Sequence, residues 1–231
     1  MGHSNHVELI GHYGSDALIG LAAWTSTARD LTEERKGRLP QFLKELAQAG
    51  HHSPFERGFL HFLVTVDTAT HIHILKHRIA VSANGESARY RELKEDKFLI
   101  PHDWPDGERI QLLEHMLQSF QRYHAALKRL EPVVGRKRAK ESARFYLPYA
   151  NQLYLDTTFN LRSFFHFQKL RNSSHAQLEV REVAQQMLKL VRGLGVFQHS
   201  LAAFGDHGCD ICPFAEPCVH LIALQRVNAM E

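Results

Sequence analysis

The feature that most limits the possible folds is the presence of two hydrophobic periods along the chain. Residues 6–12 and 58–66 alternate between the two sides of an extended chain, as β-strands do. Residues 108–130 and 176–194 instead repeat apolar side chains every three to four positions, which is typical of amphipathic helices. Helical segments outnumber strand-like ones, so we predict an α+β fold that is mostly helical with a small sheet.

The remaining segments can be assigned in the same way. We expect helices over 15–28, from Thr32 toward Gly50, over 68–79, 136–144 and 161–171, and an extended segment over 151–159. Thr32, Asp67 and Asn160 are suited to cap the helices that follow them. Pro40 is a possible break, and Pro132 should end the long helix. Residues 83–107 are polar and predict a loop region.

The same patterns predict which side chains face inward. In 58–66, Phe59, His61, Leu63 and Thr65 oppose Leu60, Phe62, Val64 and Val66. The apolar helix faces are Ile72, Leu75 and Ile79; Leu113, Leu117, Phe120 and Leu127; and Val180, Val183, Met187 and Leu190. These faces should pack against the sheet or against one another.

Length and composition set broader limits. A chain of 231 residues predicts one domain, 1–231, with a Cys- and His-containing tail over 205–231. No apolar run approaches the roughly 18 residues of a membrane span, and we expect neither a span nor a secretory signal. The three cysteines all lie in the tail, which suggests a reducing cytoplasm.

The charge of the chain favours a small anionic ligand. A net charge of +3 is too small to indicate nucleic-acid binding by itself. The remaining candidate for a nucleic-acid-binding module is a basic run, Arg136, Lys137, Arg138 and Lys140. Because this run lacks interleaved aromatic residues, a solvated helix face is the simpler interpretation, and we expect no nucleic-acid partner.

One segment carries most of the chemical signal, namely residues 76–90. It combines cations with hydroxyl and amide side chains and contains few apolar residues. Arg78 and Arg89 are fork-shaped donors suited to phosphate oxygens, and Ser82, Asn84 and Ser87 can bond to phosphate or to a nucleobase edge. A phosphorylated ligand would explain this composition, and a solvated loop after a helix is the alternative.

This segment resembles the signature of the flavin-dependent thymidylate synthases, Arg-His-Arg-x-x-Ser-x-Asn-x-x-Ser-x-Arg-Tyr. The chain has Lys76-His77-Arg78 followed by Ser82-x-Asn84-x-x-Ser87-x-Arg89-Tyr90. Residues 50–56 resemble the upstream Gly-His-x-Ser/Thr-Pro-Phe-Glu block of that family. Residues 143–148, 160–162, 170–171 and 175–177 resemble its later blocks in the same order. Several ordered blocks over about 130 residues are more specific than one motif.

The resemblance implies reductive methylation of carbon 5 of dUMP to dTMP, using FAD, NADPH and methylenetetrahydrofolate. It also implies a homotetramer with FAD where subunits meet. The residues implied for FAD are Ser26, Ser53, Glu56, Lys76, His77, Arg78, Ile79, Asn160, Arg162 and His166. Those implied for the nucleotide are His73, Glu86, Ser87, Arg89, Arg144 and Arg171, of which Ser87, Arg89 and Arg171 would be catalytic.

Several positions depart from the signature. Lys76 keeps the charge of the first arginine but loses its planar fork. Val81 is an added residue, and Gly85 stands where Glu is common, so that Glu86 could take over its role. His73 stands where Gln is common. Because an added residue and a glycine would make room for a ribose 2′-hydroxyl, the alternative substrate is UMP, as in the branch of the family found in nucleoside-antibiotic pathways.

The cysteines and histidines allow other interpretations. Classical thymidylate synthase needs a cysteine nucleophile, but Cys209, Cys212 and Cys218 lie outside every matching block. These cysteines could hold Zn²⁺ or an iron–sulfur cluster, although three reduced thiols are the simpler interpretation. His73 and His77 have the spacing of a metal-binding pair on a helix but lack a third ligand nearby. We therefore expect no metal.

Overall fold

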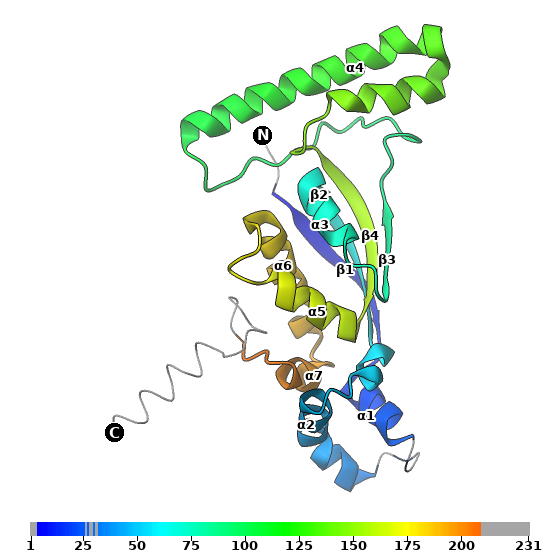
Figure 1. Ribbon diagram of the computed structural model, residues 1–231, viewed down its shortest axis with the longest axis vertical. Coiled ribbons are helices and arrows are strands. Elements are labelled where there is room, and N and C mark those ends of the chain that lie inside the picture. Colours follow the sequence, from blue (N-terminus) through cyan, green and yellow to red (C-terminus); the bar gives the residue numbers. More distant parts are fainter. Residues whose placement is uncertain (1–3, 26, 28–29, 31, 209–231) are drawn as a thin grey trace. The chain divides into compact units, whose positions relative to one another are not determined.

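The computed structural model describes residues 4–25, 27, 30 and 32–208. One sheet has the strand order β1-β2-β4-β3, formed by β1 (His6–Tyr13), β2 (Phe59–Asp67), β4 (Gln152–Asn160) and β3 (Val81–Gly85) (Figure 1). The helices are α1 (Asp16–Trp24), α2 (Glu33–Gln48), α3 (Thr68–Leu75), α4 (Asp106–Ala143), α5 (Leu161–Arg171), α6 (Leu178–Leu194) and α7 (Gln198–Ala203), with short 3₁₀ helices η1 (Ser53–Arg57) and η2 (Arg144–Tyr146). The predicted α+β class, mostly helical with a small sheet, is confirmed.

The chain forms two compact units that interleave in sequence. The first contains the N-terminal residues through Val7, Leu63–Lys76 and Ala83–Asp156. The second contains Glu8–Phe62, His77–Ser82 and the chain from Thr157 onward. All four strands pass from one unit into the other.

The first unit is built around α4, which is a helical hairpin. Gly135 has φ 78° and ψ 155°, a conformation that interrupts the helix and favours glycine. The chain reverses there, and Figure 1 shows the second part running beside the first. Tyr123, Ala126 and Leu127 before the turn pack with Ala139 and Ala143 after it.

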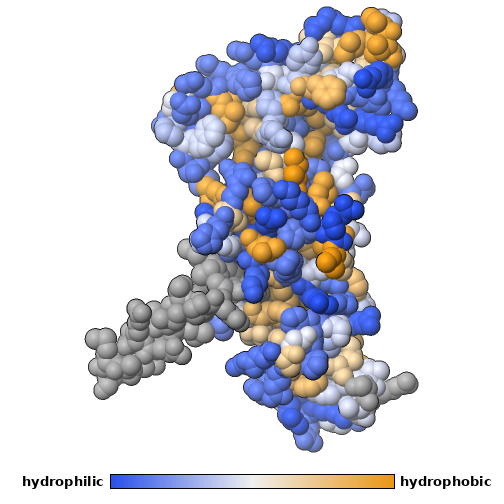
Figure 2. All heavy atoms as spheres, viewed as in Figure 1, coloured by the Kyte–Doolittle hydropathy of each residue, from blue (hydrophilic) through white to orange (hydrophobic). Residues whose placement is uncertain are grey.

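A second feature of this unit is the exposed end of the hairpin. Val133 is 77% exposed and Val134 44%. Figure 2 shows hydrophobic side chains gathered at this turn. Single exposed valines are common, but two adjacent ones leave apolar surface that none of the described residues covers.

The second unit has an aromatic core. The Phe62 ring lies 6.0 Å from that of Phe164 in a stacked arrangement and 6.3 Å from that of Phe159 in an edge arrangement. Phe159 also packs against Phe167 at 5.3 Å. These rings come from β2, β4 and α5, so the core fixes α5 against two strands that are neighbours in the sheet.

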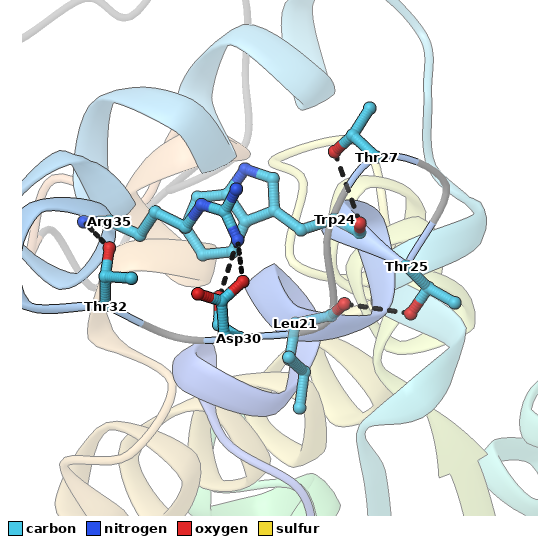
Figure 3. Close-up of polar contacts among 7 residues, drawn as sticks. All are labelled: Leu21, Trp24, Thr25, Thr27, Asp30, Thr32 and Arg35. Atoms are coloured by element: carbon cyan, nitrogen blue, oxygen red, sulfur yellow. Dashed lines mark hydrogen bonds and ion pairs between the residues drawn. The ribbon is translucent and has the colours of Figure 1, made fainter.

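The connection between α1 and α2 is held by an arginine (Figure 3). The guanidinium of Arg35 lies 5.6 Å from the centre of the Trp24 ring and donates to the main-chain oxygen of Asp30 at 2.6 Å and to its carboxylate at 2.9 Å. Trp24 in turn stacks on Phe42 at 4.6 Å. The end of α1 is therefore tied to α2 through an aromatic and an ionic contact.

Many local predictions agree with this structure. Thr32, Asp67 and Asn160 accept from the main-chain N–H three residues later, as expected for caps. In β2, Leu60, Phe62, Val64 and Val66 are buried, as the alternation predicts. Val180, Val183 and Met187 of α6 are buried, and Leu190 is partly buried.

Other local predictions were wrong. Pro40 lies inside α2 without a break, and Pro132 lies inside α4, three residues before the turn at Gly135. Pro132 is exposed, so water can satisfy the carbonyl that a proline leaves without a partner. Residues 83–85, predicted as the start of a loop, instead belong to β3, because the edge of β4 offers hydrogen-bond partners that local composition does not reveal.

Two predicted helix faces also differ from the structure. In α4, Phe120 and Leu127 are buried as predicted, whereas Leu117 is 46% exposed and Met116 and Tyr123, which were not predicted, are buried. Helix α3 ends at Leu75, and the predicted stripe of Ile72, Leu75 and Ile79 is 40%, 39% and 86% exposed. In the described ranges no helix is long and apolar enough to cross a membrane.

Asp16 provides a test of how α7 is anchored. Its carboxylate is 6% exposed and accepts from the main-chain N–H of His199 at 2.7 Å, from that of Ser200 at 2.9 Å and from the Ser200 hydroxyl. Asp16→Ala leaves these donors without their partner, and we expect the free energy of unfolding to fall by about 2–3 kcal/mol in urea denaturation. Asp103→Ala, at an exposed position, is the control. Equal losses in both variants would contradict this role.

Candidate active site

The second unit contains a cavity of about 510 Å³. It lies among the end of α2, η1, the turn before β3, α5 and the end of α7. The side chains that line it include Gln48, His52, Glu56, Ile79, Arg162, Ser163, Phe165, His166, Lys169 and Phe204. A volume in this range is typical of a site for a small molecule or a cofactor.

One face of α5 supplies the cationic wall of this cavity. Asn160 caps the helix by accepting from the Ser163 N–H at 2.8 Å. The register set there places Arg162, His166 and Lys169, at positions i, i+4 and i+7, on one helical face. The Nη1 of Arg162 donates to Glu56 Oε1 at 2.6 Å. Before any ligand binds, Arg162 is thus paired with a carboxylate at the cavity wall.

An apolar side chain is presented by the turn that precedes β3. Ala80 has φ 51°, which is unusual for a residue other than glycine. The turn is held by the Ser163 hydroxyl, which donates to the Ile79 carbonyl at 2.8 Å, and by the Asn160 N–H, which donates to the Ala80 carbonyl at 3.2 Å. Such strain is often found where a side chain must be presented to a ligand. Here Ile79 is 86% exposed at the rim of the cavity.

Another part of the lining is aromatic. Phe204 stacks on Phe165 with ring centres 4.2 Å apart and packs edge-on against Phe55 at 4.8 Å. The ring of His52 lies 5.0 Å from that of Phe204, and its Nε2 donates to the Ala47 carbonyl at 3.1 Å. The cavity therefore combines cations for an anionic group with apolar walls for a planar ring.

Arg171, at the end of α5, is hydrogen-bonded to the signature histidine. Its Nε donates to His77 Nε2 at 3.0 Å, although the two residues are 94 positions apart. Burial lowers the pKa of Arg171 from its ordinary value. A partly desolvated guanidinium interacts more strongly with an anion or carbonyl than a solvated one does.

In the first unit, Arg89 is paired with Glu141 of α4. The Arg89 Nε donates to Glu141 Oε1 at 2.7 Å, and Arg138 donates to the other carboxylate oxygen at 3.3 Å. The hydrogen bond from Arg89 lowers the pKa of Glu141, and the same bond raises the pKa of Arg89. Because the pair uses Nε, it leaves the terminal nitrogens of Arg89 for another partner. The Ser87 hydroxyl accepts from the Arg89 N–H at 3.3 Å.

Glu86 is tied to the sheet. Its N–H donates to the Tyr154 carbonyl at 2.7 Å, and its carboxylate accepts from the Tyr154 N–H at 3.2 Å. Arg91 lies 3.5 Å from the same carboxylate. These contacts are structural, since they extend the pairing of β3 with β4.

Gly85 adjoins a histidine rather than open space. A Cβ at this position would lie only 2.9 Å from Nε2 of His71. That nitrogen is buried without a hydrogen-bond partner, and burial lowers the pKa of His71. Room made by glycine at position 85 is therefore filled, at least in part, by the His71 ring.

The structure thus groups some of the predicted residues and not others. Glu56, Ile79, Arg162 and His166 line the cavity, whereas Ser53, His77, Arg78 and Asn160 are outside its lining. Lys76 follows α3, His73 is in its last turn, and Arg144 begins η2. Ser26 and the three cysteines lie outside the described residues. His77 lies beyond the end of α3, so it does not share a helix with His73 as expected.

Sequence reasoning missed Lys169, His52, Phe204 and Glu141. Lys169 could have been found, because it is seven residues after Arg162 on the same predicted helix. His52 adjoins a matching block. Phe204 and Glu141 carried no local signal, since their relevance depends on long-range packing.

Two alternative interpretations can be compared with the described chain. Within residues 4–25, 27, 30 and 32–208, no group of three His, Cys, Asp or Glu side chains could hold a metal ion. The basic run is engaged internally: Arg136 pairs with Glu131 at 3.2 Å, and Lys140 donates to the Tyr90 carbonyl at 2.7 Å. Two members of the run thus have partners within the chain, and the absence of a nucleic-acid partner stays a prediction.

Comparisons with known proteins agree with this geometry. The family model described as thymidylate synthase complementing protein matches residues 8–194. The flavin-dependent thymidylate synthase of Pseudothermotoga lettingae is 33% identical over 196 residues, covering 81% of this chain and 85% of that protein. That of Thermotoga neapolitana is 31% identical over 193 residues, covering 80% and 85%.

A solved structure is also similar. The UMP/dUMP methylase PolB from Streptomyces cacaoi, in a crystal structure with 5-Br dUMP bound, has a TM-score of 0.72 and 29% sequence identity. The match covers 88% of this chain and 97% of that one. Because the family model covers most of the chain and a relative is 33% identical to it, the chain belongs to the flavin-dependent thymidylate synthase family. It is therefore an enzyme of the thymidylate synthase type.

The Arg89–Glu141 pair predicts a pH-dependent stability. The folded chain holds the pKa of Glu141 below its unfolded value of about 4.3, so the pair contributes fully above that pH. Its contribution is lost as the pH falls through the folded pKa. We expect Glu141→Gln to lower the melting temperature at pH 7, and the difference from the wild type to disappear in acid. Glu114→Gln, at an exposed position on α4, is the control. A difference that persists in acid would contradict the assignment.

Proposed function

We propose that this enzyme methylates carbon 5 of dUMP to give dTMP, using FAD, methylenetetrahydrofolate and NADPH. The observation that carries the proposal is the cavity in which four residues implied by the family resemblance, Glu56, Ile79, Arg162 and His166, come together. Family membership supports the flavin, since the curated relatives are named flavin-dependent thymidylate synthases.

The residues around the cavity fit a flavin dinucleotide. Arg162, His166 and Lys169 are suited to a diphosphate, and Ile79, Phe165 and Phe204 are suited to a planar ring. When bound, the flavin supplies the electrons that reduce the transferred one-carbon unit. Such a route requires no protein nucleophile, in keeping with cysteines that all lie beyond the family match at 8–194.

In this proposal, arginines bind the nucleotide and polarise its pyrimidine ring. We assign Arg89, Arg144 and Ser87 to the nucleotide, with the two guanidinium groups neutralising its phosphate. Arg171 would polarise a uracil carbonyl. When carbon 5 acts as a nucleophile, negative charge builds on the pyrimidine, and a preorganised, partly buried guanidinium stabilises that charge.

A homotetramer with FAD between subunits remains part of the proposal. A dinucleotide is long, and the cavity of one chain would receive a portion of it. The apolar side chain of Ile79, 86% exposed at the rim of the cavity, supports a covered surface at this position. We further propose that the enzyme acts in the cytoplasm on free nucleotides.

UMP is the second candidate substrate. PolB, which resembles this chain in structure, is described as acting on UMP as well as dUMP. Gly85 makes less room for a ribose 2′-hydroxyl than the sequence suggested, because His71 occupies the adjacent space. We therefore keep dUMP as the primary proposal.

Parallel turnover assays test this function directly. Purified protein supplied with FAD, NADPH and methylenetetrahydrofolate should convert dUMP to dTMP, with product identified by mass spectrometry. Conversion of UMP alone would establish the second candidate. Bound flavin with no product from either nucleotide would contradict the proposal.

Lys169 tests the assignment of the cationic wall. Lys169→Met removes one charge while keeping an unbranched side chain, and we expect about tenfold weaker FAD binding from the loss of one charged hydrogen bond. Flavin fluorescence titration gives the dissociation constant. Lys189→Met, at an exposed position on α6, is the control and should bind FAD like the wild type. Unchanged binding in both variants would remove Lys169 from the site.

A further inference from the structure

The contact between Arg171 and His77 carries information about protonation. An arginine Nε always bears hydrogen and can only donate, so His77 Nε2 must accept through its lone pair. His77 is therefore neutral in this structure, with its hydrogen on Nδ1. The bond occupies Nε of Arg171 and does not use the two terminal nitrogens of its fork.

Packing defines the place of the His77 ring. The ring meets Phe167 of α5 edge-on, with centres 4.9 Å apart, and lies 6.1 Å from the ring of His166. His77 and Arg171 are both partly buried. A guanidinium held through Nε by a packed ring has fewer orientations than one on a free side chain.

We infer that His77 is a positioning residue, which as a neutral acceptor orients the guanidinium of Arg171 toward the pyrimidine nucleotide. The inference rests on the proposed function, in which Arg171 polarises the uracil ring. Orientation matters because a displacement of about 1 Å at a reacting group can cost on the order of a hundredfold in rate. This role is separate from any contact that His77 makes with a cofactor.

The same contact predicts a dependence on pH. Protonation of His77 removes the acceptor and places two positive charges against each other. The titratable and charged groups packed against it from α5 are Arg171 and His166, and Lys76 and Arg78 flank it in the sequence. Nucleotide affinity should therefore fall in acid, as His77 gains a proton.

Two variants separate the acceptor from the ring. His77→Gln supplies an oxygen that accepts at every pH tested, whereas His77→Phe keeps an aromatic ring beside Phe167 and removes the acceptor. His115→Gln, at an exposed position on α4, makes the same chemical change as a control. Binding of dUMP is measured by calorimetry across the pH range, together with kcat and KM, and flavin content is measured separately.

We expect His77→Phe to weaken dUMP binding by about 10- to 100-fold at pH 8, the loss of one hydrogen bond to a charged group. His77→Gln should bind dUMP nearly as the wild type does at pH 8 and keep that affinity at pH 5, where the wild type and His115→Gln lose it. If His77→Phe does not fold, the inference is tested by His77→Gln alone, whose affinity for dUMP should not change with pH.

Two results would overturn the inference about His77 and leave the proposed function unaffected. One is wild-type affinity in a folded His77→Phe variant, and the other is an acid loss in His77→Gln equal to that of the wild type. A wild-type protein that binds neither dUMP nor UMP would instead overturn the proposed function, and the inference with it.

Discussion

The start of α5 is the constraint on which the candidate site depends. Asn160 caps the helix through its side chain and donates its own N–H to the Ala80 carbonyl, while the Leu161 N–H donates to the Gly58 carbonyl at 2.8 Å. One junction thereby joins β4, the start of β2 and the turn before β3. Because the register of α5 begins there, the direction of every side chain along its cationic face follows from this junction.

Counter-ions are the second common feature of the site. Arg162 is paired with Glu56, and Arg89 with Glu141. Under the proposed function these cations bind phosphate groups, and a carboxylate beside each one reduces its repulsion of other cations. Both pairs are partly exposed, so screening keeps them weak enough for a phosphate to compete for the guanidinium. Arg171 differs, because a neutral histidine holds it without reducing its charge.

The site could be predicted in part. The motif blocks led to Glu56, Ile79, Arg162 and His166, which the fold brings to one cavity although they come from three separate segments. Phe204, which the sequence did not indicate, depends on packing. It reaches the cavity because Asp16 anchors α7. The departures at positions 76, 81 and 85 could be located in the sequence, but the partner of Gly85 could not, since His71 lies on a different element.

Short-range patterns by themselves determined the class of fold, the buried face of β2, the three capping residues and the family. The first three depend on residues within about four positions of one another, where hydrogen-bond geometry and side-chain period act directly, whereas the family rests on the order of the motif blocks along the chain. Only the tertiary structure decided that residues 81–85 pair with β4, that the helix passes Pro132 and turns at Gly135, and that Ile72, Leu75 and Ile79 remain exposed. It also decided the bond between Arg171 and His77. These outcomes join residues far apart in the chain, and the free energy that selects them comes from packing and strand pairing that no local pattern contains.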